Sequence, residues 1–290
     1  MELHPMLLRF KARKALKGHW QTALVAAFAA GLFNTLYQVA VKVKVDMNAL
    51  RDQAVDFLTY GQPIRFDLSQ LVLPGIFYVL ALLLTPALQL GLRQFYLMRL
   101  RGEEAPFAVI FSRMGIFFKA LGLDVLIQLR ILLWSLLGLS PLLLMLFMPN
   151  LSPNLVLALL WPSVIASVVL MFMAVYRYVL APFAMAEEPS LSVIQAIRLS
   201  KGWMKDHKAA FLMVQLGFFG WMMLRTLIPF ALYQQLNPVL TTMIELFADL
   251  ALSVYMMTAY AAFYQARVQT PPKTEENTFE AYIENDREDK

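Results

Sequence analysis

Residues 71–92 read LVLPGIFYVLALLLTPALQLGL and carry no formal charge. About 20 apolar residues in a helix cross roughly 30 Å of hydrocarbon, so this run predicts a transmembrane span. Five other long apolar runs bring the number of predicted spans to about six: 20–41, 71–92, 120–147, 155–178, 209–233 and 239–264. We therefore expect an all-α, multi-pass membrane protein.

The composition supports this class. Apolar residues make up 59% of the chain and charged residues only 16%, whereas soluble domains are near 25% charged. The chain has no cysteine, which excludes disulfides, iron–sulfur clusters and thiolate-bound metals. Three parts are expected: a cytoplasmic amphipathic N-terminal segment (1–19), a six-helix transmembrane domain (20–264), and a disordered acidic cytoplasmic tail (265–290).

Lysine and arginine alternate between the two sides of the predicted spans. Clusters lie around Lys14, Arg101 and Lys201, whereas the connections around Asn150 and Asn237 contain no cation. Cationic segments near span ends are retained in the cytoplasm. Both termini are therefore expected to be cytoplasmic. The first connection carries charges of both signs, and its residues 47–60 predict a short amphipathic helix on the outer surface.

Two cytoplasmic segments, 6–18 and 190–207, have apolar and cationic residues at helical spacing, with Ser190 as the expected N-cap of the second. Helices of this kind can lie on anionic lipid. The expected lipid-facing cations are Arg9, Arg13, Lys14, Lys17, Arg198, Lys201, Lys205 and Lys208. The alternative is that these cations only fix the topology, which the positive-inside rule already explains.

Ionisable residues inside spans are costly and therefore informative. Glu245 and Asp249 are four residues apart in the sixth span and share a helical face, and Arg225 in the fifth span is expected at a similar depth. The three residues form either a structural salt bridge or an acidic site for a cation, proton or amine. Asp124 and Arg130 are interpreted as interfacial residues of the third span.

Prolines and small residues give further expectations about the helices. Pro141 and Pro229 are expected to break or kink their helices. The small-residue spacings Ala27 to Gly31 and Gly217 to Gly220 suggest close helix contacts.

No motif indicates catalysis. The sequence contains no phosphate-binding glycine loop, no His-Glu-x-x-His helix and no Gly-x-Ser-x-Gly elbow. We therefore expect no enzyme activity, no cofactor and no metal site. The net charge of +5 does not indicate nucleic-acid binding, because topology and lipid already account for the cations.

Several short pieces occur in a specific order along the chain. They are Ala12-Arg13-Lys14-Ala15-Leu16-Lys17-Gly18-His19-Trp20, Trp134-Ser135-Leu136-Leu137, Glu188-Pro189 with Ala196-Ile197 and Ser200, Met204 with His207-Lys208, Gly220-Trp221, and Ala262-Phe263-Tyr264. This set resembles the bacterial membrane family catalogued as domain of unknown function 975. Glu187 and Glu188 replace the family's usual Asp, and Gly138, Ser140 and Pro141 replace its usual Pro-Gly break. The resemblance implies a six-span protein of the bacterial cytoplasmic membrane and implies no reaction.

Three functions remain open. The favoured one is a non-enzymatic membrane organiser or regulator that acts on lipid or protein partners, because the amphipathic cationic helices are clear and a catalytic site is not. The alternatives are a small transporter or transport accessory that uses the intramembrane acids, and an integral-membrane enzyme. Anionic membrane lipids are the expected partners, with a membrane-protein partner or a second copy of the chain as further possibilities.

Overall fold

The computed structural model describes residues 4–45, 47–63, 68–145, 152–232 and 238–268. Every regular element in these residues is a helix or a short 3-10 turn. The elements are α1 (Pro5–Leu16), α2 (Trp20–Lys44), α3 (Met47–Tyr60), α4 (Leu68–Leu100), η1 (Phe107–Phe111), η2 (Met114–Ile116), α5 (Phe117–Met145), α6 (Pro153–Tyr178), α7 (Ala181–Glu187), α8 (Val193–Trp203), α9 (Lys208–Leu216), α10 (Phe219–Leu232) and α11 (Pro238–Val268).

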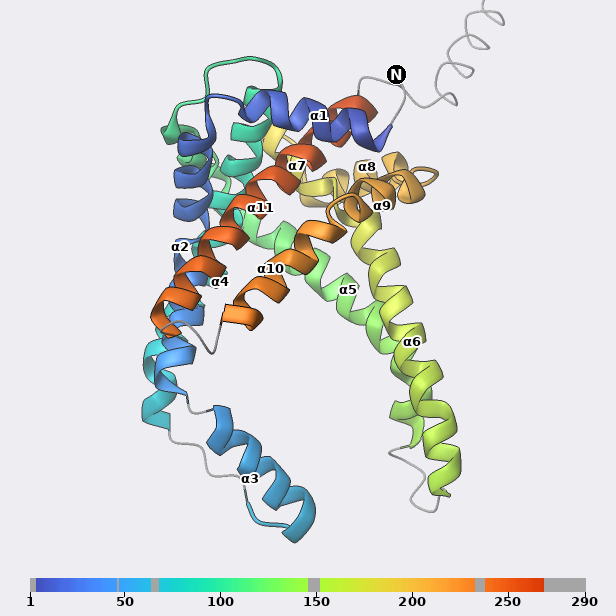
Figure 1. The fold of residues 1–290 in the computed structure, drawn as a ribbon. Coiled ribbons are helices and arrows are strands. Elements are labelled where there is room, and N and C mark those ends of the chain that lie inside the picture. The colour runs from blue at the N-terminus through green and yellow to red at the C-terminus, as the bar shows by residue number, and fades with distance from the viewer. Residues whose placement is uncertain (1–3, 46, 64–67, 146–151, 233–237, 269–290) are drawn as a thin grey trace, which may run out of the picture.

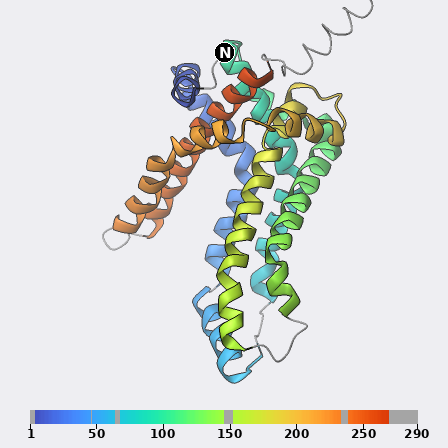
Figure 2. The same cartoon turned by 90° about the vertical axis from the view of Figure 1, so that its right-hand side faces the viewer.

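Three helical hairpins extend from one layer of short helices (Figure 1). The hairpins are α2 with α4, α5 with α6, and α10 with α11. The short elements α1, η1, α7, α8 and α9 gather at one end, which we call the end layer, and α3 lies at the opposite end. The α10–α11 hairpin leans away from the other two (Figure 2). All the segments predicted to be cation-rich therefore lie at the same end of the molecule.

Five stretches of the described chain are helical, long and apolar enough to cross a membrane: Trp20–Val41, Leu68–Leu100, Ala158–Glu187, Lys208–Ile228 and Met243–Val268. They overlap five of the six predicted spans. Residues 120–145 of the predicted third span, 120–147, lie in α5, which is not one of these five, and residues 146–147 lie outside the described part of the chain. The chain is thus all-helical over the described residues, with five helices suited to a membrane.

The α5–α6 hairpin is held by a close backbone contact. A Cβ atom on Gly138 of α5 would lie only 2.3 Å from the Cα atom of Ser167 on α6. The Ser167 hydroxyl donates a hydrogen bond to the Ser135 carbonyl, with an O···O distance of 2.9 Å. Glycine, which has no Cβ, is therefore required where these two helices cross.

Buried side chains concentrate in the end layer and the adjoining turns of the long helices. Leu8 and Leu16 of α1, Phe183 of α7 and Phe263 of α11 are each at most 1% exposed and belong to one apolar cluster. Further along the hairpins, large apolar side chains such as Trp161 are exposed on the outside. The helix ends thus pack against protein, while the hairpin surfaces have the apolar character that lipid requires.

Some local features differ from the sequence predictions. Helices α5 and α10 continue through Pro141 and Pro229, so neither proline breaks its helix, while a kink at either proline stays a prediction. Instead, the predicted fifth span is interrupted at Gly217, between α9 and α10. Helix α8 begins after Ser192, whose hydroxyl accepts from the Gln195 backbone N–H in a capping box, so Ser190 is not the N-cap.

The C-terminal boundary also differs from the sequence prediction. Helix α11 continues to Val268, so residues 265–268 of the expected acidic tail are helical. The rest of that tail lies outside the described residues. Helix α3 covers the same residues, 47–60, for which the sequence predicts a helix.

Candidate functional site

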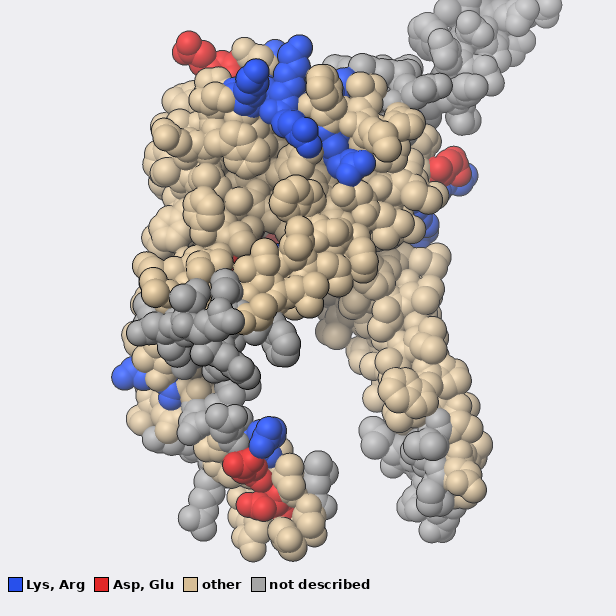
Figure 3. Space-filling model, viewed as in Figure 1, with Lys and Arg blue, Asp and Glu red and all other residues tan. Residues whose placement is uncertain are grey.

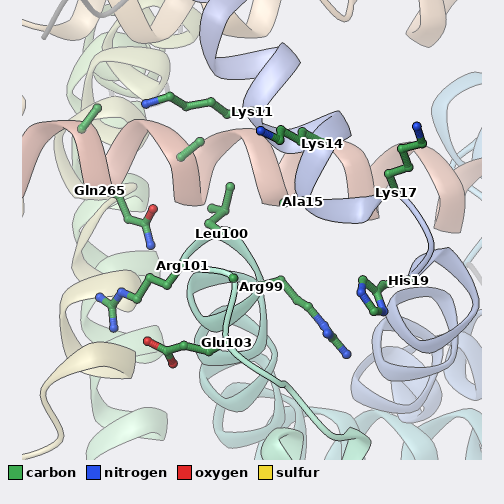
Figure 4. A pocket seen from close by; sticks show the side chains of 13 residues that line it. Lys11, Lys14, Ala15, Lys17, His19, Arg99, Leu100, Arg101, Glu103 and Gln265 are labelled. Carbon is green, nitrogen blue, oxygen red and sulfur yellow. The ribbon is translucent and has the colours of Figure 1, made fainter.

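A cationic pocket of about 530 Å3 opens in the end layer, among the C-terminal ends of α1 and α4 and the last turns of α11 (Figure 4). Glu103 is the acidic residue of its lining. The cations that line it are Lys11, Lys14, Lys17, Arg99 and Arg101. In Figure 3 the Lys and Arg side chains gather over this end, above a wide surface of uncharged residues. The charge balance of the pocket therefore favours an anionic ligand.

Two glycines turn the chain at the edge of this pocket. Gly18 follows α1 with φ +80° and Gly102 follows α4 with φ +77°, a left-handed conformation that glycine adopts without a steric penalty. After Gly102, the backbone N–H of Glu103 donates to the Met98 carbonyl at 3.0 Å. Both helices thus end sharply, and their last cationic side chains lie around the same space.

Helix α1 is fixed to the protein by Arg9. Its Nη1 donates to the Gly217 carbonyl at 2.8 Å, and the Tyr255 hydroxyl donates to the Arg9 carbonyl at 3.3 Å. A Cβ on Gly217 would lie 2.6 Å from that Nη1, so the glycine makes room for the guanidinium. The structure therefore places Arg9 at the break between α9 and α10, away from the pocket.

The outward face of α1 combines apolar and cationic residues. Leu8 and Leu16 are buried against the protein, whereas Met6 and Phe10 are 67% and 63% exposed. Arg13 is also exposed and lies three residues after Phe10, on the same helical face. This face has the composition of a helix at a membrane surface.

Several cations of the end layer already hold partners. Arg99 Nη2 donates to the Ala105 carbonyl at 2.8 Å. Arg101 forms an ion pair with Glu187, whose other oxygen accepts a hydrogen bond from the Tyr264 hydroxyl at 2.7 Å. These contacts tie the ends of α4, α7 and α11 together, which gives Arg101 a structural role beside the pocket.

Lys14 and Lys17 differ from these arginines. Both are exposed, both line the pocket, and neither side chain makes a hydrogen bond or ion pair with another described residue. Their ammonium groups are available to a ligand at no cost in broken protein contacts. Of the predicted lipid-facing cations, these two best fit an anion-binding role.

The second predicted cation group lies elsewhere in the end layer. Arg198, Lys201 and Lys205 are exposed on or just after α8, and Lys208 begins α9. None of the four lines the pocket. Helix α8 packs against the protein through Ala196, Ile197 and Ser200, which are all buried, and the Ser200 hydroxyl donates to the Arg177 carbonyl at 3.0 Å. The structure therefore does not bring the two predicted cation groups into one site.

Two of the three charged residues of the predicted intramembrane cluster contact each other. Arg225 of α10 forms an ion pair with Asp249 of α11. Glu245 lies one turn before Asp249 and is half-buried. The paired side chains are 43% and 47% exposed, so they lie on the surface of the α10–α11 hairpin and line none of the described pockets.

Histidine contributes little to this end of the molecule. Burial lowers the pKa of His207, and the nearby Arg267 lowers it further, so this imidazole is neutral at neutral pH. His19 lines the cationic pocket. Among the residues that the structure describes, no three His, Asp or Glu side chains are grouped as a metal site would need.

Sequence reasoning missed two sets of residues. Arg99 and Arg101 were interpreted only as topology signals, because their approach to α1 depends on tertiary packing.

A second cavity, among α2, α4 and α5, is lined by Arg93 and Asp124. A polar spacing of four residues within apolar helices, as in Gln89 to Arg93 and Asp124 to Gln128, is the signal that could have indicated it.

Comparison with known proteins defines the family without adding a function. No curated protein and no solved structure matches the chain. Residues 6–270 match a family described as "Protein of unknown function (DUF975)", the family that the ordered sequence pieces resemble. Because this match covers nearly the whole chain, the protein belongs to the DUF975 family.

Proposed function

We propose that the protein is a non-enzymatic organiser or regulator of the bacterial cytoplasmic membrane that holds anionic phospholipid headgroups in its cationic pocket. The observation that carries this proposal is the uncommitted pair Lys14 and Lys17, which faces a pocket of net positive charge beside the exposed apolar face of α1. Lipid-regulated binding of a membrane-protein partner is the role that this arrangement supports.

We further propose that α5 is a sixth span and that the end layer lies in the cytoplasm. Helix α5 packs along α6, which is a candidate span, so both helices of the hairpin belong at the same depth. An odd number of spans would also place the chain ends on opposite sides, yet α1 and α11 pack against each other. The cation-rich end layer then faces the cytoplasm.

Cysteine labelling tests this topology, since the chain has no cysteine of its own. Cysteines introduced at Asn150 and Asn237 are expected to react with an impermeant maleimide in intact cells. A cysteine at Lys201, the matched control, is expected to react only after lysis. Reaction at Asn150 and Asn237 only after lysis would show that the orientation is reversed.

Thermal unfolding with added lipid tests the pocket. Short-chain phosphatidylglycerol is expected to raise the Tm of the purified full-length protein more than phosphatidylcholine does. The double variant K14Q/K17Q should weaken phosphatidylglycerol binding roughly thirtyfold, because each lysine near an anionic surface contributes about 1 kcal/mol. Higher salt should weaken binding to the wild type more than to this variant.

The matched control is K201Q/K205Q, which removes two exposed cations outside the pocket. It is expected to keep nearly the wild-type affinity. Equal losses in the two double variants would point to diffuse attraction by the whole end layer and would refute the pocket.

A transporter that uses the intramembrane acids is the weaker candidate. Asp249 is already paired with Arg225 on the hairpin surface, and neither residue lines a described cavity. This geometry supports the structural interpretation of the charge cluster.

A further inference from the structure

A second cavity, of about 490 Å3, lies within the membrane helices and is separate from the cationic pocket. Polar side chains line it at four-residue spacing along two helices. They are Thr85, Gln89 and Arg93 on α4, and Asp124 and Gln128 on α5. Residues four apart share one helical face, so both helices present a polar stripe to the same space. Polar and charged side chains at this depth lower the stability of the fold unless a ligand or water contacts them.

The two charges of this cavity are not paired directly. Arg93 and Asp124 are close enough to attract each other, but within the described chain they form no hydrogen bond or ion pair with each other or with another residue. The Arg93 guanidinium carbon lies 5.6 Å from the ring centroid of Phe183, and its Nε is enclosed with no hydrogen-bond acceptor. Among the described residues, the Arg93 Nε is thus left without an acceptor, and the half-buried Asp124 carboxylate is left without a donor, so an anionic group could bind the first and a cationic donor the second.

The cavity also has a polarity gradient. Arg93 and Asp124 lie near Pro182 of α7 and the end layer. Tyr78 is fifteen residues earlier on α4, roughly 22 Å further along the helix axis, where its ring centroid is 5.4 Å from that of Tyr37. The charged end is thus at the proposed cytoplasmic side, and the aromatic end is deeper in the spans. An amphiphile in the cytoplasmic leaflet is arranged in the same way, with its charged headgroup at the cytoplasmic side and its apolar part deeper in the membrane.

We propose that this cavity binds a zwitterion of the phosphoethanolamine type, with its phosphate on Arg93 and its primary ammonium on Asp124. A phosphate accepts paired hydrogen bonds from a guanidinium, and a primary ammonium donates hydrogen bonds to a carboxylate. A quaternary ammonium has no N–H to donate. The site should therefore distinguish ethanolamine from choline, and it does not depend on the anion-binding pocket around Lys14.

This chemistry has two sources, a phosphatidylethanolamine headgroup and the free solute. Native mass spectrometry and thermal unfolding of the wild-type, full-length protein separate them. Short-chain phosphatidylethanolamine is expected to bind at least about tenfold more tightly than the matching phosphatidylcholine. Stabilisation by O-phosphoethanolamine as well would identify a soluble zwitterion as a ligand, whereas stabilisation by the lipid alone would identify the headgroup.

Variants test the assigned contacts. D124N keeps the shape of the side chain and should weaken phosphatidylethanolamine binding about tenfold or more, while changing phosphatidylcholine binding little. The matched control is R130Q on the same helix, because Arg130 lies over the Tyr178 ring and does not line the cavity. Equal wild-type binding of the two lipids would overturn the proposal even if D124N failed to fold. Unchanged selectivity in a folded D124N would also overturn it.

Discussion

Gly138→Ala is expected to separate the α5–α6 hairpin and to leave little folded protein at temperatures where the wild type is stable. The added Cβ would lie 2.3 Å from the Ser167 Cα and 2.4 Å from its backbone nitrogen, and backbone atoms cannot move aside as a flexible side chain can. Overpacking of this kind costs about 3 kcal/mol, which corresponds to a fall in Tm of about 5–10 °C. Thermal unfolding in detergent, followed by size-exclusion chromatography, measures this loss.

Gly31→Ala and Gly220→Ala are the matched controls. Both glycines lie inside helices, and a Cβ at either position would meet no atom within 4 Å. Alanine is favoured over glycine in a helix by about 1 kcal/mol, so these variants should be as stable as the wild type or slightly more stable. If all three variants behaved alike, the close crossing at Gly138 would be wrong.

Arg225→Ala is the second change expected to have a large effect. It would leave Asp249 without its ion-pair partner on the surface of a span, where an unpaired charge costs about 2.5–3.5 kcal/mol. The corresponding fall in Tm is about 5–10 °C. The variant carrying Asp249→Asn in addition should recover part of this loss, because no charge is then left unpaired.

Glu245→Gln serves as the comparison, since this residue is one turn from the ion pair. It is expected to lower the Tm less than Arg225→Ala does. If Arg225→Ala, Glu245→Gln and Asp249→Asn, each made alone, left the Tm intact while abolishing a cation-dependent flux in proteoliposomes, the structural interpretation would be refuted in favour of transport.

The small-residue patterns show how sequence and structure differ in what they reveal. The spacing of Ala27 and Gly31 suggests a close helix contact, yet Gly31 faces open space in the described structure. Gly91 and Gly138 belong to no pair that the sequence singled out, but a Cβ on Gly91 would lie 2.0 Å from the Ile110 carbonyl oxygen. Spacing fixes which residues share a helical face, but the partner on the facing helix depends on how the hairpins pack.

For the charged residues too, the sequence indicates which side chains share a helical face, and the tertiary structure decides what they contact. A four-residue spacing placed Glu245 and Asp249 on one face, and the expected partner Arg225 does meet Asp249 across the neighbouring helix. For Asp124 the sequence indicated only an interfacial position, because Arg93, which lines the same cavity, lies 31 residues earlier on another helix. Loop connections do not specify the rotation of one helix against the next.

By itself, the sequence determined that the chain is all-helical, where its long apolar helices lie, and which segments carry the cations. These properties follow from local hydrophobicity and charge, which each segment satisfies independently of the others. Only the tertiary structure decided that Lys14 and Lys17 meet Arg99 and Arg101 around one pocket, and that Arg93 faces Asp124. These contacts join residues far apart in the chain, and their geometry is fixed by helix crossings that no local pattern encodes.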